Sequence, residues 1–108
     1  MTDVIYENSH QEIPVTYLDT DNSVIPAGSV GYAKYAILDS GGNCILTKET
    51  GNGISVVGDQ FLITIDQADI TQSGANFSHQ FSVGDTSTEL EPPIFNNQLA
   101  IGSVTRCP

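Results

Sequence analysis

The chain has 108 residues, the length of one domain and enough to bury roughly two-thirds of the surface that the unfolded chain exposes. Thirteen Asp and Glu residues stand against three Lys and Arg residues, so the formal net charge is −10. This charge argues against nucleic acid or an anionic membrane surface as a partner, because both would repel the chain.

The sequence contains no targeting or membrane-spanning signal. Residues 1–11 lack the basic start and apolar run of a signal peptide, and no stretch approaches the roughly 18 apolar residues of a membrane span. We therefore expect a soluble protein made in the cytosol.

The cysteines and histidines are isolated from one another. Cys44, Cys107, His10 and His79 form no closely spaced pair, whereas structural zinc needs about four nitrogen or sulfur ligands. We expect no metal and no cofactor. A disulfide between Cys44 and Cys107 is disfavoured by cytosolic synthesis but stays open.

The N-terminal part predicts an arm followed by a strand. Residues 1–11 lack periodicity and predict an extended arm, tied down at residues 4–6, ahead of a single domain over residues 12–108. Ile13, Val15 and Tyr17 then alternate with their neighbours, as in a half-buried strand. Pro14 cannot donate to a ladder, which places this part of the strand at an edge or at its start, and residues 19–23 supply a turn.

The middle of the chain predicts three strands separated by turns. A turn at 26–29 precedes a strand over 30–38, in which the small residues Gly31 and Ala33 indicate a bulge or the close approach of another strand. Residues 39–43, with two glycines, give the strongest hairpin signal. Short strands over 44–47 and 54–57 follow.

The last part predicts three more strands. Residues 61–65 alternate, residues 66–74 predict a single helical or 3₁₀ turn between two sheets, and residues 77–83 alternate again. A polar loop over 84–93 leads to a final strand that holds Phe95, Leu99, Ile101 and, at its end, Val104. About seven short strands with frequent turns favour an all-β chain folded as an antiparallel β-sandwich over a barrel or an α/β fold.

The order of these strands and turns resembles the small immunoglobulin-like domains encoded among the virion structural genes of tailed bacteriophages and prophages. Asn22 and Asn97 depart from the pattern by standing where glycine is expected, and His79 stands where a large residue such as tyrosine is usual. The matching pieces are residues 15–21 (VTYLDTD), 33–42 (AKYAILDSGG), 63–71 (ITIDQADIT), 77–83 (FSHQFSV) and 99–106 (LAIGSVTR).

The resemblance implies an immunoglobulin-like antiparallel β-sandwich without enzymatic activity. Such a domain would be located in the virion after synthesis in the host cytoplasm. It would bind other virion proteins of the capsid, neck or tail, with capsid decoration or cementing the first expectation and self-association a further one. The alternative is an adhesion or receptor-binding module that recognises a bacterial surface.

The acidic loops carry the residues that most resemble a metal site. Residues 19–23 (DTDNS) look like the start of a calcium loop, but valines stand at its sixth and twelfth positions, where an EF-hand needs Gly and Glu. A hairpin turn is favoured, and an irregular calcium site among the acidic loops stays open. Loop carboxylates also occur at Asp39, Asp59, Asp66 and Asp69.

No group of residues predicts catalysis. His79 and Ser78 are neighbours on a strand and point to opposite faces, so they cannot act as base and nucleophile, and Ser82 lies in no nucleophile motif. We expect His79 to pack at the sheet surface. Asp66 and Asp69 predict a capped turn rather than a glycosidase pair.

Two further features have simple structural interpretations. Asn76 begins a glycosylation sequon, which has no meaning without a secretory signal. Tyr32 and Tyr35 are opposite in phase, so one of them should face outward, where it could contact a protein or lie across its neighbours.

Overall fold

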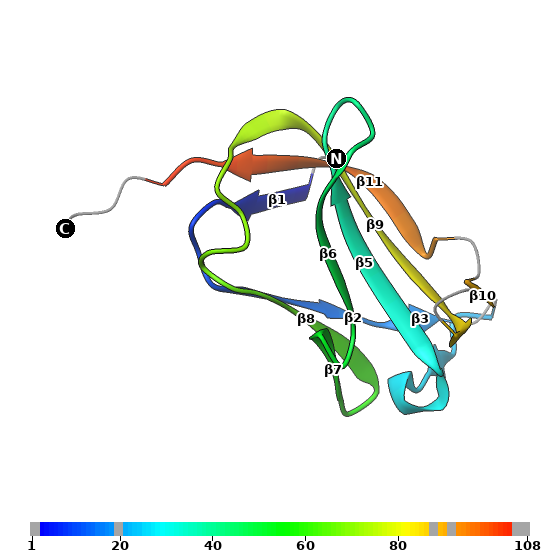
Figure 1. Ribbon diagram of the computed structural model, residues 1–108. Coiled ribbons are helices and arrows are strands. Elements are labelled where there is room, and N and C mark those ends of the chain that lie inside the picture. Colours follow the sequence, from blue (N-terminus) through cyan, green and yellow to red (C-terminus); the bar gives the residue numbers. More distant parts are fainter. Residues whose placement is uncertain (1–2, 19–20, 87–88, 91–92, 105–108) are drawn as a thin grey trace.

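The computed structural model describes residues 3–18, 21–86, 89–90 and 93–104 of an all-β chain (Figure 1). The prediction of an all-β protein is confirmed. Within the described residues, the longest helical element is a three-residue 3₁₀ turn, η1 (Ala27–Ser29), so none of their helices could cross a membrane. The strands are β1 (Asp3–Tyr6), β2 (Gln11–Val15), β3 (Tyr17–Leu18), β4 (Val24–Ile25), β5 (Tyr32–Leu38), β6 (Cys44–Thr50), β7 (Gly53–Val57), β8 (Gln60–Ile65), β9 (Gly74–Thr86), β10 (Glu89–Leu90) and β11 (Phe95–Gly102).

Nine of the described strands form one curled sheet. Its order is β1-β11-β9-β5-β6-β7-β8-β2, with β10 added beside β9, while β3 and β4 pair separately. A short parallel pairing of β6 with β7, at Glu49↔Gly53 and Thr50↔Ile54, joins the two halves. The sheet is nearly barrel-like, but β1 and β2, which follow each other in the chain, are the two ends of the order and are not paired with each other.

The core is made by the inward positions of the alternating strands. Phe81 of β9 contacts Phe61 of β8, with ring centroids 5.4 Å apart, and stacks on Phe95 of β11 at 6.0 Å. Each large apolar side chain that is fully buried contributes about 1.5–3 kcal/mol. Together they make core burial the main force that curls the sheet. The largest fully buried side chains are Tyr35, Ile37, Phe61, Ile63, Ile65, Phe81 and Leu99.

The turns use the residues that the sequence indicated. The β5–β6 hairpin is closed by residues 39–43, with Gly42 at φ 83°. Asn22 adopts φ 68°, so asparagine takes a left-handed position where the resemblance suggested glycine. Gly31 permits a close approach, because a Cβ atom there would lie 2.6 Å from the backbone oxygen of Asp85. Of the two predictions for Gly31, close approach is the correct one.

The N-terminal segment is held at the point that the sequence predicted. Asp3–Tyr6 form β1, which runs parallel to β11, and Ile5 is buried in the core. Beyond β1, the Glu7 amide donates to Gly102. Residue 11 already belongs to β2, whose place at the end of the sheet confirms the edge position predicted from Pro14.

Four local predictions were wrong in whole or in part. The single strand expected over 13–18 is divided at Thr16 into β2 and β3. Part of the polar loop expected over 84–93 belongs to strands, because β9 continues to residue 86 and pairs with β10. Residues 66–69 form the predicted single turn, closed by a hydrogen bond from the Asp69 amide to the Asp66 carbonyl, but this turn links β8 to β9 of the same sheet and not two sheets. The 3₁₀ turn η1 lies within the turn predicted over 26–29, and Val104 lies just beyond β11, outside the final strand.

Candidate functional site

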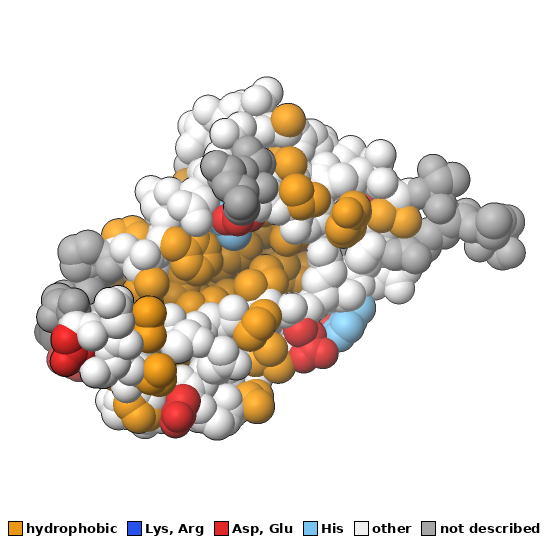
Figure 2. Space-filling model, turned by 180° about the vertical axis from the view of Figure 1, so that it is seen from behind, with side chains coloured by type: hydrophobic (Ala, Val, Ile, Leu, Met, Phe, Trp, Pro, Cys, Tyr) orange, Lys and Arg blue, Asp and Glu red, His pale blue; other side chains and the backbone are white. Residues whose placement is uncertain are grey.

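A groove of about 450 Å³ separates β1 from β2. Figure 2 shows it as a hollow in one face of the molecule, with hydrophobic side chains on its floor. The volume lies within the roughly 300–1,000 Å³ that is usual for ligand clefts. Its apolar lining comes from Val4 and Ile5 of β1, Ile13 and Val15 of β2, and Ile94 and Phe95 at the start of β11.

The groove is bordered by two strands that each have only one neighbour in the described sheet. β1 pairs with β11 alone, and β2 pairs with β8 alone. Along β1, backbone groups alternate in direction, and the Glu7 amide bonds to β11. The N–H and C=O groups of Tyr6 and Val4 therefore point away from β11, toward the groove side.

Next to the groove, the side chain of Gln11 in β2 bridges to the backbone of Tyr6 in β1. Its Nε2 donates to the Tyr6 carbonyl at 2.8 Å, and its Oε1 accepts from the Tyr6 amide at 2.9 Å. The side-chain amide of Gln11 thus gives the Tyr6 backbone the two hydrogen bonds that a neighbouring strand would give. The backbone of Val4, two residues earlier and pointing the same way, has no such partner strand among the described residues.

A chain of three polar side chains joins β1, β9 and β5 at the wall of the groove. His79 Nε2 lies 2.7 Å from Asp3 Oδ2, and His79 Nδ1 lies 2.8 Å from the Tyr35 hydroxyl. Asn97 Nδ2 also donates to Asp3 Oδ2 at 3.2 Å. The carboxylate can only accept, so Nε2 donates to it, and a neutral ring then accepts the Tyr35 proton at Nδ1.

The electrostatics of this Asp3–His79–Tyr35 relay keep Asp3 ionised and Tyr35 neutral. The hydrogen bond from His79 lowers the pKa of Asp3 below its usual value and outweighs the opposing effect of partial burial. Burial raises the pKa of Tyr35 far above its usual value, and the charge of Asp3 adds to this rise. Tyr35 therefore donates a hydrogen bond and does not become a phenolate.

The relay has the order carboxylate, imidazole, hydroxyl, but its last member is enclosed. Tyr35 has no exposed surface, and its ring packs edge-on against His79 at 5.6 Å, while Phe95 covers His79 at 4.9 Å. A nucleophile has to reach its substrate. This geometry suits a clamp that holds β1 against the sheet.

The structure corrects the prediction that His79 packs at the sheet surface. Its side chain faces the core and is 6% exposed, because a tyrosine hydroxyl and a carboxylate satisfy both ring nitrogens there. Ser78 and Ser82 lie on the opposite phase of β9, as predicted. Asp3 was missed because it is 76 positions from His79 in the chain. The available signal was a histidine on an inward phase, which needs polar partners.

The acidic loop residues bond within their own turns. Asp21 accepts from the Ser23 amide at 3.0 Å, and Asp39 accepts from the amides of Gly41 and Asn43. A hydrogen bond from the Ser23 side chain, followed by the one from its amide, lowers the pKa of Asp21, and the bonds from the Asn43 and Gly41 amides lower the pKa of Asp39. Asp19 lies outside the described residues. Within the described ranges, no three His, Cys, Asp or Glu side chains are grouped closely enough to hold a metal ion.

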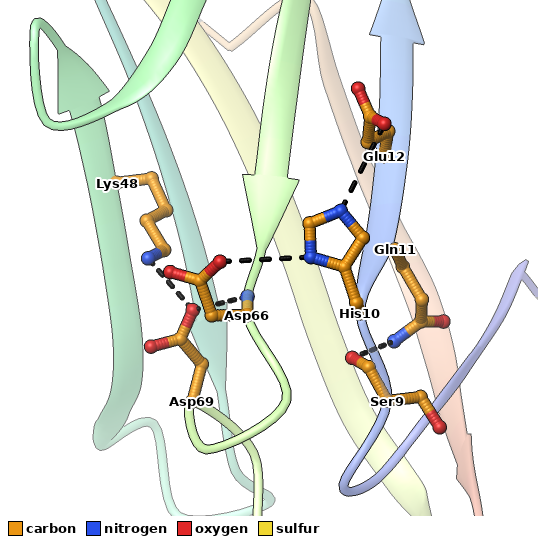
Figure 3. Close-up of polar contacts among 7 residues, drawn as sticks. All are labelled: Ser9, His10, Gln11, Glu12, Lys48, Asp66 and Asp69. Carbon is orange, nitrogen blue, oxygen red and sulfur yellow. Dashed lines mark hydrogen bonds and ion pairs between the residues drawn. The ribbon is translucent and has the colours of Figure 1, made fainter.

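A second polar cluster lies where β2, β6 and the turn after β8 meet (Figure 3). Lys48 Nζ lies 2.8 Å from Asp69 Oδ2, and the same oxygen accepts from the Asp66 amide at 2.7 Å. His10 lies 3.7 Å from Asp66 and 3.9 Å from Glu12. The cluster therefore links the start of β2 to the turn that follows β8.

The carboxylate of Asp69 is bonded within this turn and to Lys48. Partial burial acts to raise its pKa, but the hydrogen bonds from Lys48 and the Asp66 amide, with the charge of Lys48, give a net lowering. The capped turn predicted for Asp66 and Asp69 is confirmed, since the Asp69 carboxylate bonds the Asp66 amide. A carboxylate with a lowered pKa does not suit the role of a general acid.

The remaining candidates lie apart from the groove. Tyr35 is the buried member of the tyrosine pair, and Tyr32 is half-buried, with its hydroxyl donating to Glu49. That hydrogen bond is the main reason that the pKa of Tyr32 is raised to about 12. Cys44 is exposed with a free thiol, whereas Cys107 lies outside the described residues. Asn76 is exposed on β9.

Comparison with known proteins gives no relative from which a role could be transferred: the chain matches no family model, no curated protein and no solved structure.

Proposed function

We propose that this chain is a non-enzymatic structural module of a tailed-bacteriophage virion that binds another virion protein. Capsid decoration or cementing is the first candidate role, and a neck or tail accessory is the next. The observation that carries the proposal is the apolar groove between two edge strands. Surfaces of this kind bind extended protein segments by adding a strand.

The strand order supports an immunoglobulin-like architecture for this module. In immunoglobulin domains, one sheet contains strands C, F and G, and the other contains B, E and D. If β2, β5, β7, β8, β9 and β11 are taken as B to G, then β5-β9-β11 and β7-β8-β2 have this order. β6 then takes the place of the additional strand C′. The first strand differs, because β1 lies beside β11 and not beside β2.

The chemistry of the described side chains favours binding over catalysis. The relay ends in a buried tyrosine, and the second cluster ties Lys48 and Asp69 to each other. The net charge of −10 would keep many copies soluble before assembly. Symmetric display on a particle would then convert a weak individual contact into firm attachment.

The test compares association with particles and with host cells. The purified chain, fluorescently labelled at the exposed Cys44, is mixed with empty capsids, with tails and with host cells. We expect it to co-sediment with one of the particle preparations and not to label cells. Labelling of host cells without association with any particle would favour the receptor-binding alternative and overturn the proposal.

A further inference from the structure

We propose that the groove between β1 and β2 accepts one extended segment of a partner protein that has apolar side chains at alternate positions and carries lysine or arginine. The proposal rests on the protein-binding role proposed above and adds the site and the chemistry of the partner. The segment would pair with β1 and complete the curled sheet. The physical basis is that an edge left unpaired by the described strands and an apolar floor occur at the same place.

The backbone of β1 provides the edge to which a guest strand would bind. The Val4 N–H and C=O groups point away from β11, and Val4 is one of the residues that line the groove. β1 has four residues and β2 has five, so the guest would be matched over about four or five residues, roughly 15 Å at the usual rise per residue.

The directions of the strands define the orientation of the guest. Following the pairings round the sheet from β2 to β1, β1 runs antiparallel to β2. A strand placed between them must be parallel to one and antiparallel to the other. It would enter from the end of the groove away from Gln11, because the Gln11 side chain already occupies the edge at Tyr6.

The floor of the groove requires apolar side chains from the guest. Ile13 is half-buried and Val15 is almost fully buried, and Phe95 adds an aromatic surface. Side chains on a strand alternate between faces, so every second residue of the guest would lie on this floor. The other residues would face solvent and are free to be polar.

Charge complementarity decides between a partner protein and a second copy of this chain. Asp3 lies on the wall of the groove, is 41% exposed and is ionised at neutral pH, and Glu12 on β2 is 51% exposed. Two copies that each carry −10 would repel one another, whereas a basic segment would be attracted. We therefore assign the groove to a basic segment of a different protein.

The first experiment uses three synthetic peptides of about nine residues and the whole chain. One alternates valine with lysine and threonine, one has glutamate in place of lysine, and one has proline at the centre of the basic sequence. We expect the basic peptide to bind at least about 10-fold more tightly than either of the others, measured by fluorescence anisotropy of labelled peptide. Equal binding of the basic and acidic peptides would overturn the charge argument.

Nuclear magnetic resonance locates the bound peptide. We expect shifts of the amide signals of Val4, Ile5, Ile13 and Val15, and none at Val57, a comparably exposed valine on β7 (57% against 55% for Val4). Shifts at Val57 but not at Val4, or dimerisation of the chain through the groove in place of peptide binding, would overturn the proposal.

A matched pair of variants tests pairing through the backbone. Val4→Pro removes an N–H that β11 does not use, whereas Val4→Ala keeps it. We expect Val4→Pro to weaken binding of the basic peptide by about fivefold or more and Val4→Ala by much less. Equal losses would exclude strand pairing at Val4. If Val4→Pro does not fold, the peptide with central proline makes the same test from the other side of the contact.

Particle association, measured separately with the same variants, distinguishes the two proposals. If wild type and Val4→Pro bind particles equally well and neither binds the basic peptide, the proposed function stands. The groove is then excluded as the binding site. A chain that binds the basic peptide in the groove but no particle retains the site and loses the virion role.

Discussion

The N-terminal segment is held by two histidine–carboxylate contacts that differ sharply in their surroundings. At the start of β1, His79 is 6% exposed and lies 2.7 Å from Asp3. At the start of β2, His10 is 59% exposed and lies 3.7 Å from Asp66 and 3.9 Å from Glu12. The same pair of residue types therefore occurs once as a buried relay and once as a loose surface cluster.

The difference shows that a histidine–carboxylate contact stabilises its strand when the histidine is buried and both of its ring nitrogens are hydrogen-bonded. His79 has both ring nitrogens bonded inside the protein, so removing it takes away the hydrogen-bond partner that the Tyr35 hydroxyl has among the described residues. An unpaired buried group costs about 1–3 kcal/mol. Water can take the place of the contacts that His10 makes at little cost in stability, because exposed charged contacts contribute about 0–1 kcal/mol.

The largest expected effect comes from breaking the buried relay. His79→Ala should lower the free energy of unfolding by about 3 kcal/mol, since it creates a cavity and leaves the Tyr35 hydroxyl unpaired. His10→Ala, the matched control on the surface, should change it by less than about 0.5 kcal/mol. Urea unfolding at neutral pH measures both. Equal losses for the two variants would contradict the comparison.

His79→Phe sharpens the same prediction. Phenylalanine restores most of the volume among Tyr35 and Phe95 but none of the hydrogen bonds. It should recover part, and only part, of the stability lost in His79→Ala. Complete recovery would mean that His79 acts as a packing residue and that the relay contributes nothing.

An intermediate effect is expected at the cation of the second cluster. Lys48 is 12% exposed and Asp69 is 23% exposed, and the Lys48 stem covers Gly53 so closely that a Cβ there would lie 2.2 Å from Cδ. Lys48→Met keeps an unbranched apolar stem over Gly53 and leaves Asp69 without its cation. We expect a loss of about 1 kcal/mol in urea unfolding. Stability equal to wild type would show that only the stem matters.

The smallest expected effect is the pH dependence that Asp3 contributes. Because the folded-state pKa of Asp3 is lowered from 3.8, its contribution is complete above pH 3.8 and is lost as the pH falls through the lowered value. Asp3→Asn should be less stable than wild type by at most about 1 kcal/mol at neutral pH, since Asp3 is 41% exposed. The difference should shrink in unfolding curves taken below pH 3.8. A difference that grows on acidification would have the wrong sign.

Much of the fold could be predicted from the sequence because its signals are local. Alternation at Phe77, Phe81 and Val83 reports the pleat directly, and the glycines at 41 and 42 report a turn. The continuation of β9 past Val83 was missed because Gly84 and Asp85 have low strand propensity. Gly84 belongs to the strand because it pairs with Tyr32 of β5, and β10 continues the pairing at Thr86.

The candidate site was much less predictable. The groove depends on β1 lying beside β11, a contact between the two ends of the chain that no local pattern encodes. The relay likewise brings together positions 3, 35 and 79. Only the edge position of Pro14 and the attachment at residues 4–6 could be predicted, because they depend on the properties of single residues and short segments.

The Gln11 side chain also has a consequence for the behaviour of the free protein. Open sheet edges are templates for aggregation, and proteins protect them in various ways. Here one amide side chain occupies the edge at Tyr6 through two hydrogen bonds. A second chain therefore cannot extend the pairing along the whole of β1, and only a short stretch remains accessible. The Gln11 side chain in this way protects the chain against fibre formation through β1.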